Sequence, residues 1–354
     1  MKARLAPDLR FAVPGDIGTV SGGYRYDRML IDALTRKGRV VKLLSWPGAY
    51  PFPSPSEAAE AARSLAACPD GSVVLVDGLA FGALPEVAVA EGRRLRLVAL
   101  VHHPLALETG LSAEDRTRLA ESERRALGAA RGIVATSQTT ADCLIRDYAV
   151  DPRIVTVALP GTDPVNEFSA GLSRLAPGPP RVLSVGNLIP RKGHDVLVAA
   201  LAAVADLDWI CTIVGSPDRA PDTAREIRAA IAGCGLEARI GLAGEAAEVA
   251  PFYRQADLFV LASRHEGYGM VFAEALRFGL PVVGTTAGAI PEVVPPSAGI
   301  LVPPDDVAAL AAALRSLIVD EGRRTRLAAG ARLAGAGLPG WEETAAHVAA
   351  ALAR

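Results

Sequence analysis

The chain has 354 residues, of which 50% are hydrophobic and 5% are aromatic. A chain of this length and hydrophobicity can bury a large core, which excludes a disordered protein and indicates two domains. The formal net charge of −2 provides no overall positive field, so we expect no nucleic acid partner.

The cysteines and the apolar runs indicate the compartment. The chain has four cysteines, which lie far apart without a CxxC pair, and this predicts reduced thiols rather than disulfides or a metal site. The start, MKARLAPDLRFAVPGD, lacks the apolar region of a secretory signal. No apolar run approaches the roughly 18 residues that a membrane helix needs. We therefore expect a cytoplasmic location.

Short runs rich in Val, Ile and Leu alternate with longer segments of helical period in the first half of the chain. This alternation predicts an α/β domain with a mostly parallel sheet covered by helices on both faces, that is, a doubly wound domain. The expected strands are 9–13, 39–44, 73–76, 95–101, 132–135 and 154–157, and the expected helices are 22–37, 56–67, 84–91, 112–130 and 137–147.

Residues 161–180, GTDPVNEFSAGLSRLAPGPP, lose all periodicity and are rich in Pro, Gly and Ser, which is typical of an interdomain linker. The alternation then starts again and predicts a second doubly wound domain of similar size. Its expected strands are 181–185, 209–214, 238–242, 257–261, 281–284 and 299–301, and its expected helices are 192–204, 222–233, 246–254, 270–278, 289–294 and 305–318.

The Ala-rich tail, 320–354, predicts two or three further helices. Its last segment, WEETAAHVAAALA, could pack back on the first domain. The predicted organisation is an N-terminal domain over 1–165, a linker over 166–180 and a C-terminal domain over 181–354. Ligands of open α/β sheets bind outside the carboxyl ends of the strands, and two such domains facing each other would form one cleft. The residues directly after each strand are therefore the candidates for chemistry.

Two strands of the first half end in candidate residues. After the first strand, PGDIGTVSGGY leads into a helix that begins near Gly22 and Gly23, where free backbone N–H groups favour an anion such as phosphate. The alternative is a plain strand-to-helix turn. After the fourth strand, His102 could hydrogen-bond a sugar hydroxyl or accept a proton, and the alternative is a solvated or structural histidine.

Two cations follow the first strand of the second half, in SVGNLIPRKG. The turn at Gly186 and the expected helix start place Arg191 and Lys192 where a diphosphate could sit. The alternative is that both side chains are ordinary solvated surface.

The segment RHEGYGMVFAEALRFG holds two glutamates eight positions apart, after an expected strand. If a helix begins near Met270, Glu266 lies in the loop and Glu274 lies about one turn inside the helix, with the free N–H groups of the helix start between them. A nucleotide sugar, with hydroxyls at both ends and phosphates between, would match this layout. The alternative is an acid at a helix start together with an ion-paired helix residue.

These motifs, in this order along nearly the whole chain, resemble a family 4 glycosyltransferase of the two-domain GT-B fold. Glu266 to Glu274 is similar to the E-x7-E motif of that family. The segments Arg191-Lys-Gly193 and Leu159-Pro-Gly-Thr-Asp163 are similar to its R-K-G and P-N-G-V-D motifs, and Gly22-Gly23 is similar to its opening.

The resemblance implies transfer of a hexosyl group from a nucleoside-diphosphate sugar to a hydroxyl acceptor, with retention and without a metal or other cofactor. It implies that Glu274 binds the ribose and that Glu266 and His102 contact the donor sugar. Arg191 and Lys192 would hold the diphosphate. The further donor-binding positions are Gly22, Gly23, Gly186, Gly267, Gly269, Met270 and Val271.

Two other functions stay open at this point: a non-catalytic protein that binds sugar nucleotides, and an epimerase-like enzyme of the same fold. The sequence leaves the base and sugar of the donor open. The acceptor could be a glycan precursor, a small molecule or a lipid, and we lean towards a soluble one. Helix 112–130 mixes acids with its arginines, so a peripheral membrane contact is not indicated, although the sequence leaves it open.

Overall fold

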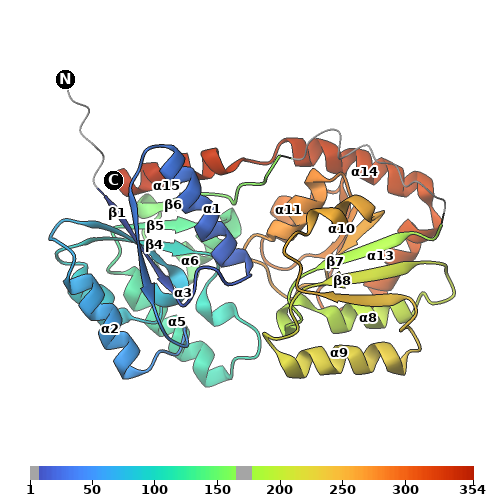
Figure 1. The fold of residues 1–354 in the computed structure, drawn as a ribbon, viewed down its shortest axis with the longest axis horizontal. Coiled ribbons are helices and arrows are strands. Elements are labelled where there is room, and N and C mark those ends of the chain that lie inside the picture. The colour runs from blue at the N-terminus through green and yellow to red at the C-terminus, as the bar shows by residue number, and fades with distance from the viewer. Residues whose placement is uncertain (1–7, 165–177) are drawn as a thin grey trace. The chain divides into compact units, whose positions relative to one another are not determined.

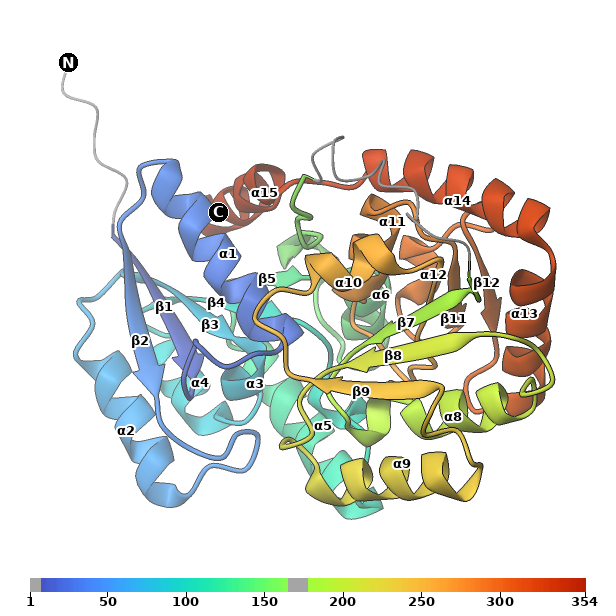
Figure 2. The same ribbon diagram turned by 45° about the vertical axis from the view of Figure 1, so that its right-hand side comes forward.

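The computed structural model describes residues 8–164 and 178–354, which form two six-stranded sheets with every strand pair parallel (Figures 1 and 2). Helices lie on both faces of each sheet. The predicted α/β class with two doubly wound sheets is confirmed. Most of the expected linker, residues 166–177, lies outside the described residues.

The first sheet has the strand order β2-β1-β3-β4-β5-β6. Its strands are β1 (Leu9–Pro14), β2 (Val41–Trp46), β3 (Val73–Asp77), β4 (Arg96–Val101), β5 (Gly132–Ala135) and β6 (Val155–Val157). The accompanying helices are α1 (Gly22–Arg36), α2 (Pro55–Ala66), α3 (Gly78–Phe81), α4 (Pro85–Glu91), α5 (Ala113–Leu127), α6 (Gln138–Asp147) and α15 (Trp341–Ala353), with short 3₁₀ turns η1 (Leu105–Leu107) and η2 (Pro152–Ile154).

The second sheet has the strand order β12-β11-β10-β7-β8-β9. Its strands are β7 (Arg181–Val185), β8 (Ile210–Val214), β9 (Ile240–Gly244), β10 (Leu258–Val260), β11 (Val282–Thr285) and β12 (Gly299–Val302). The accompanying helices are α8 (His194–Ala202), α9 (Pro221–Gly233), α10 (Ala250–Gln255), α11 (Met270–Arg277), α12 (Ile290–Val293), α13 (Val307–Val319) and α14 (Glu321–Ala336), with the 3₁₀ turn η3 (Pro190–Lys192).

Each sheet reverses its strand order at one place, and ligands of such sheets bind beside that place, outside the carboxyl ends of the strands. In the first sheet the chain leaves β1 towards β2 and leaves β3 in the opposite direction, so the reversal lies between β1 and β3. In the second sheet it lies between β7 and β10. The segments that follow these four strands are therefore the places to look for a site.

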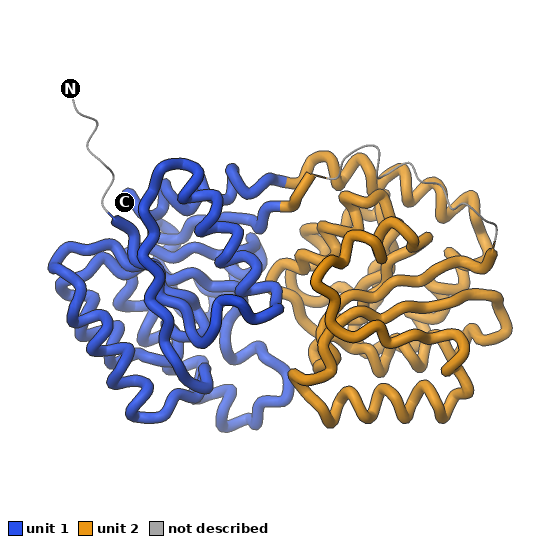
Figure 3. The backbone as a smooth tube through the Cα atoms, viewed as in Figure 1, with its two compact units in different colours: residues 1–161, 339–354 blue, residues 162–338 orange. Residues whose placement is uncertain are grey.

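The chain divides into two compact units (Figure 3). Unit 1 comprises Met1–Gly161 and Pro339–Arg354, and unit 2 comprises Thr162–Leu338. The sequence assigned 181–354 to one domain, with the last helix packing back as an option, whereas the structure groups residues 339–354 with unit 1. Within unit 1, Trp341 of α15 is buried and contacts the ring of Tyr26 on α1 at a centroid distance of 5.6 Å.

An aromatic cluster fixes α11 against the second sheet. Phe272 of α11 meets Phe259 of β10 edge-on at a centroid distance of 5.4 Å, and both side chains are fully buried. Aromatic pairs of this geometry add to the hydrophobic gain from burial. The start of α11, and the loop before it, are thus held in place by the core.

Candidate active site

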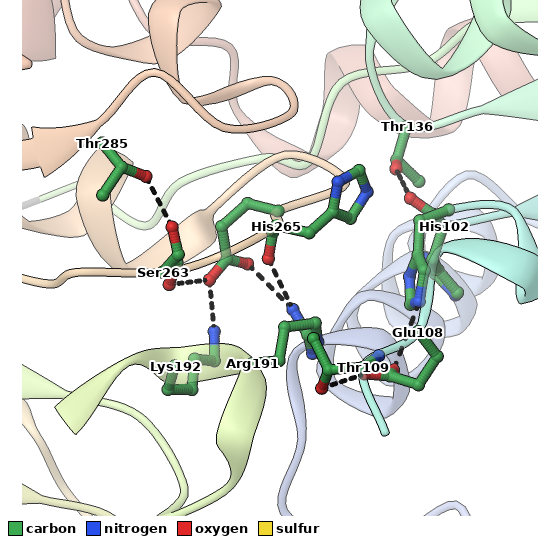
Figure 4. A network of polar contacts seen from close by, with 11 residues as sticks. His102, Glu108, Thr109, Thr136, Arg191, Lys192, Ser263, His265 and Thr285 are labelled. Atoms are coloured by element: carbon green, nitrogen blue, oxygen red, sulfur yellow. Dashed lines mark hydrogen bonds and ion pairs between the residues drawn. The ribbon is translucent and has the colours of Figure 1, made fainter. Parts of the chain in front are cut away.

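Glu266 lies in the loop between β10 and α11 of unit 2 and is 6% exposed. Its Oε1 accepts hydrogen bonds from Lys192 Nζ at 2.6 Å and from Ser263 Oγ at 2.7 Å. Its Oε2 accepts one from a terminal nitrogen of Arg191 at 3.4 Å. Figure 4 shows Ser263, Lys192 and Arg191 with these contacts as dashed lines. The structure therefore brings together three of the residues that the sequence singled out.

These contacts keep Glu266 ionised. Burial alone would raise the pKa of its carboxyl, but the positive charges of Lys192 and Arg191 and the hydrogen bonds from Lys192 and Ser263 lower the pKa to about 2. A buried carboxylate is costly unless it is paired and hydrogen-bonded, and here both conditions are met. The Glu266 loop and the turn that carries Arg191 and Lys192 thus present one negative and two positive charges in a fixed arrangement.

Backbone contacts fix the shape of this loop. Arg191 donates to the carbonyl oxygen of His265 at 3.1 Å, and Ala289 N donates to the carbonyl oxygen of Glu266 at 2.9 Å. Gly288, with a φ of +59°, lies so close that a Cβ there would stand 2.2 Å from the carbonyl oxygen of Glu266. Only a glycine tolerates both the left-handed backbone and this approach. The segment 284–292 thus packs against the loop that holds Glu266 and keeps its backbone in place.

Helix α11 begins at Met270, as predicted, and Gly269 before it has a φ of +92°. In the described part of the chain, no side chain caps this helix start. The first N–H groups of a helix have no partner within the helix, so an uncapped start offers donors and a positive dipole end to an anion. Four of the predicted donor-binding positions surround this start, namely Gly267, Gly269, Met270 and Val271.

Glu274 lies one turn inside α11 and is partly exposed. Its Oε2 accepts a hydrogen bond from the hydroxyl of Tyr253 at 3.0 Å. Tyr253 is 2% exposed, and its ring stacks on Phe278 at a centroid distance of 5.1 Å. The sequence left a ligand contact and an ion pair open for this glutamate. The structure adds a buried neutral partner, Tyr253, which the sequence did not single out.

Arg191 and Lys192 lie in the 3₁₀ turn η3. This turn is in the segment that follows β7, one of the two strands between which the strand order of the second sheet reverses. Gly193 then adopts a φ of +63°, and a Cβ there would stand 2.0 Å from the carbonyl oxygen of Ala262. Helix α8 therefore begins at His194, two residues later than the predicted helix, and both cations lie before it. Gly186 makes room for Lys192, since a Cβ there would stand 3.2 Å from Lys192 Cδ.

In unit 1, helix α1 begins at Gly22, so the prediction that Gly22 and Gly23 lie at a helix start is confirmed. Ser21 caps the helix by accepting from Tyr24 N at 3.3 Å. A Cβ at Gly22 would meet nothing within 4 Å, whereas a Cβ at Gly23 would stand 3.4 Å from His102 Cδ2. The structure thus places His102 beside the start of α1.

His102 contacts two carboxylates that the sequence analysis did not select. Its Nε2 lies 3.3 Å from Asp27 Oδ1 and 3.3 Å from Asp77 Oδ2. Asp27 is fully buried on α1, and Asp77 is the buried last residue of β3. An Asp on the buried face of α1 and an Asp that ends an apolar strand were the two sequence signals for this cluster.

The protonation of this cluster departs from ordinary values. Burial and the negative charge of Asp77 raise the pKa of Asp27 to about 7, against the lowering effect of His102. Burial lowers the pKa of His102, but the two carboxylates outweigh burial and raise it to about 10. Among the described residues, Asp27, Asp77 and His102 are also the group whose ligand atoms lie close enough, within 4.8 Å, to hold a metal ion. The expectation that no metal is required stays a prediction.

Over residues 8–164 and 178–354, the structure contains no helix that is both long enough and apolar enough to span a bilayer.

Two family models match the chain in succession. Residues 20–165 match the model described as Glycosyltransferase Family 4, and residues 179–320 match the model described as Glycosyl transferases group 1. The chain belongs to the family 4 glycosyltransferases. The two matches place the start of α1 and His102 in the first family segment, and Arg191, Lys192 and both glutamates in the second.

Curated relatives of this family 4 chain carry the name D-inositol 3-phosphate glycosyltransferase. The protein of that name from Xylanimonas cellulosilytica is 34% identical over 256 residues, covering 68% of this chain and 61% of the relative. The one from Streptomyces bingchenggensis is 30% identical over 283 residues, covering 73% of this chain and 62% of the relative. The chain thus spans about three fifths of the length of these relatives.

Solved structures of low identity show the same fold. A sucrose-phosphate synthase from Thermosynechococcus elongatus superposes with a TM-score of 0.80 at 21% identity, covering 97% of this chain and 98% of that one. Anabaena HepE in complex with UDP-glucose superposes with a TM-score of 0.77 at 19% identity, covering 97% of this chain and 99% of that one. This family 4 glycosyltransferase therefore has the GT-B fold.

Proposed function

We propose that the chain transfers a hexosyl group from a nucleoside-diphosphate sugar to a hydroxyl acceptor, with retention of the anomeric configuration and without a metal. One observation carries the proposal. The buried carboxylate of Glu266 is held between Lys192 and Arg191 immediately before the uncapped start of α11, and Glu274 follows on the same helix. Charges of both signs beside the N–H groups of a helix start suit a ligand that has both hydroxyls and phosphates.

In this proposal, Glu274 accepts hydrogen bonds from the ribose hydroxyls, and Tyr253 keeps its second oxygen in place. The N–H groups of Gly269, Met270 and Val271 meet the diphosphate at the helix start. Arg191 and Lys192 outnumber the single carboxylate between them, so the cluster keeps a net positive charge for the phosphates. Glu266 orients these two cations and accepts hydrogen bonds from the donor sugar.

The reaction breaks the bond between the sugar C1 and the leaving phosphate oxygen. The acceptor oxygen forms its bond to C1 on the same face, and the acceptor proton passes to the leaving phosphate, so no side chain has to act as the nucleophile. Arg191 and Lys192 stabilise the negative charge that grows on the leaving diphosphate, which is where preorganised cations lower a barrier most.

We assign two roles in unit 1. The N–H groups at Gly22 and Gly23 approach the diphosphate, since the space beside Gly22 is open, and His102 contacts the donor sugar. Gly186 contributes by leaving space for the Lys192 side chain.

The comparisons suggest which ligands to test first. HepE has been solved with UDP and with UDP-glucose, and the curated relatives are named for D-inositol 3-phosphate. We propose a UDP sugar as the first donor and a phosphorylated inositol, or a similar soluble alcohol, as the first acceptor. The cytoplasmic location stays a prediction, and no feature of the described residues favours an epimerase or a non-catalytic binding protein.

A transfer assay tests this function. The chain is incubated with UDP-, GDP- or ADP-glucose and with D-inositol 3-phosphate or unphosphorylated inositol, and released nucleoside diphosphate and glycosylated product are quantified. We expect Glu274→Ala to raise KM for the donor about tenfold and Arg191→Ala to lower kcat about 100-fold. Donor binding without any transfer across acceptors would favour the non-catalytic alternative, and full activity in both variants would refute the site.

A further inference from the structure

His102, Asp27 and Asp77 come from three different elements of unit 1 and meet at the reversal of the first sheet. His102 follows β4, Asp77 ends β3, and Asp27 lies on α1, which follows β1. Residues after neighbouring parallel strands meet at one edge of the sheet, so the topology itself brings these three side chains together.

The histidine ring is fixed in one orientation. The hydroxyl of Thr136 donates to the His102 carbonyl oxygen at 3.0 Å, and Tyr26 meets the ring edge-on at 5.3 Å. Gly23 lies against Cδ2, and both carboxylates lie at Nε2. The edge that carries Cδ2 and Nε2 therefore faces α1 and β3, and Nδ1 lies on the opposite edge of the ring.

The two ring nitrogens therefore have different surroundings. Nε2 lies at equal distances from two carboxylate oxygens, as expected when one N–H is shared between two acceptors. Nδ1 makes no hydrogen bond to any described residue and is not among the buried unsatisfied atoms, and the side chain is 20% exposed. Nδ1 is thus the atom that a ligand can reach.

We propose that Asp27 and Asp77 are positioning residues that keep His102 an imidazolium, with Nε2–H shared between the two carboxylates and Nδ1–H presented to the ligand. His102 would then act as a cationic hydrogen-bond donor and not as a base. This inference rests on the proposed function in one respect, namely that the ligand at Nδ1 is the donor sugar.

Charge and burial support the proposal. The groups that face the ring are Asp27 and Tyr26 from α1 and Asp77 from β3, with His103 and Glu108 nearby in the segment that follows β4. Asp27 is fully buried, and its Oδ2 has no hydrogen-bond partner among the residues that the structure describes. A buried carboxylate is stabilised most directly by a cation beside it. The pKa of His102, raised to about 10, agrees with this arrangement.

The contact between Asp27 and His102 also links His102 to the start of α1, and both are predicted to bind the donor. Asp27 lies about one turn after Gly23 on α1, so its contact with Nε2 sets the position of the helix start relative to the histidine. Loss of Asp27 would therefore disturb the charge on His102 and the approach of the α1 amides together. A carboxylate that served only the stability of the fold would leave the pH dependence of transfer unchanged.

The test is a histidine NMR titration of the full chain, which has five histidines. Long-range ¹H–¹⁵N spectra between pH 6.0 and 8.5 show which ring nitrogens carry protons. We expect both His102 nitrogens to be protonated throughout, and the Asp27→Asn/Asp77→Asn double variant to lose at least 100-fold in proton affinity, so that the ring titrates within this window. Glu108→Gln, which removes the partner of His103, is the matched control and should leave His102 unchanged.

The wild-type spectrum decides the proposal even if the double variant does not fold. A His102 ring that titrates near pH 6.5, or that carries a single proton at pH 7, would overturn it. So would a His102 signal that changes on adding EDTA or micromolar Zn²⁺, because the cluster would then be a metal site.

The rate of transfer provides a second, separable readout. In Asp27→Asn we expect kcat to fall as pH rises through the lowered His102 pKa, while the wild type shows no such decline between pH 6.0 and 8.5. A decline of this kind in the wild type would contradict the proposal. If no donor is turned over at all, the proposed function fails, whereas the NMR result on His102 still stands.

Discussion

The two glutamates of the β10–α11 segment differ in their surroundings, and this separates their roles at the scale of single residues. Glu266 is buried and has three side-chain partners, two of them cations. Glu274 is partly exposed and accepts from the neutral hydroxyl of Tyr253. A carboxylate fixed by cations organises charge, while a partly exposed one is available to a ligand.

Glu266 should stabilise the folded chain in a pH-dependent way. Its pKa is lowered from 4.5 to about 2 in the folded state, so its stabilisation is fully present above the unfolded pKa and is lost as pH falls through the folded one. A shift of this size corresponds to about 3 kcal/mol between the protonation states. Unfolding of wild type and Glu266→Gln should therefore differ most above pH 5, and the difference should decrease steadily below the unfolded pKa and vanish only near the folded pKa of about 2. A constant difference across this range would contradict the ion-pair account, and exposed Glu226→Gln serves as the control.

Tyr253 should act on the donor through Glu274. Tyr253→Phe removes the hydroxyl and keeps the stacked ring, so we expect KM for the donor to rise about threefold to tenfold with little change in kcat. A variant with unchanged KM, measured beside Glu274→Ala, would show that the hydroxyl does not position the carboxylate. A changed kcat at constant KM would point to the reacting end of the donor instead.

At the level of elements, the hydrophobic periods of the sequence predicted the strands and the longer helices, because buried parallel strands and amphipathic helices leave distinct patterns. The short helix α3 was missed, because four residues are too few to show a helical period. The observed start of a helix differs from the predicted one where the backbone takes a left-handed conformation. Gly193 with its left-handed φ ends the turn that holds Arg191 and Lys192, so α8 begins at His194. Such a break depends on the nearby Ala262 backbone, which a local pattern does not reveal.

The candidate site was predictable only in part. Glu266, Arg191 and Lys192 stand in recognisable motifs, and the structure brings them together. Asp27, Asp77 and Tyr253 do not, because their relevance comes from which strand ends and helix faces meet in three dimensions. Periodicity tells which face of α1 is buried, but not that His102 lies against it.

A substitution at Gly288 tests whether the segment 284–292 holds the loop of Glu266 in place. Gly288→Ala adds a Cβ 2.2 Å from the Glu266 carbonyl oxygen at a φ of +59°, so we expect a loss of about 2 to 4 kcal/mol in stability. Gly233→Ala is the matched control, because the space around that exposed helix residue is open. Thermal unfolding of both variants checks this, and equal melting temperatures would contradict the described loop.

Gly22 distinguishes a phosphate-binding helix start from a plain turn. An Ala at Gly22 meets nothing within 4 Å, so Gly22→Ala should leave the melting temperature unchanged or slightly raised. If a diphosphate approaches this helix start, the added methyl group should still weaken donor binding about tenfold. Unchanged binding in a titration would favour the plain turn.

At the scale of the whole molecule, the end of the described chain belongs to the unit in which the chain begins. Thr344 of α15 donates to the Leu159 carbonyl oxygen at 2.8 Å, and a Cβ at Gly161 would stand 2.4 Å from Trp341 N. Unit 1 is therefore assembled from two separate stretches of sequence. Periodicity predicts the helix itself, but it does not indicate which sheet the helix covers.

Removal of residues 339–354 should thus destabilise unit 1 and leave unit 2 largely intact. The deletion exposes β5 and β6, which α15 contacts, together with the ring of Tyr26. We expect faster hydrogen exchange in these two strands and unchanged exchange in β7 and β10. Glu342→Ala, which removes only exposed ion pairs to Arg36 and Lys37, should change neither.

The proposed function depends on a donor site built around the two glutamates of unit 2. Isothermal titration of the full chain with UDP-, GDP- and ADP-glucose measures this most directly. We expect at least one of these donors to bind the wild type, Glu274→Ala and Glu266→Gln each to weaken that binding at least tenfold, and Glu226→Ala on exposed α9 to leave it unchanged. Binding of equal strength in all four proteins, or no binding of any nucleoside-diphosphate sugar, would contradict it.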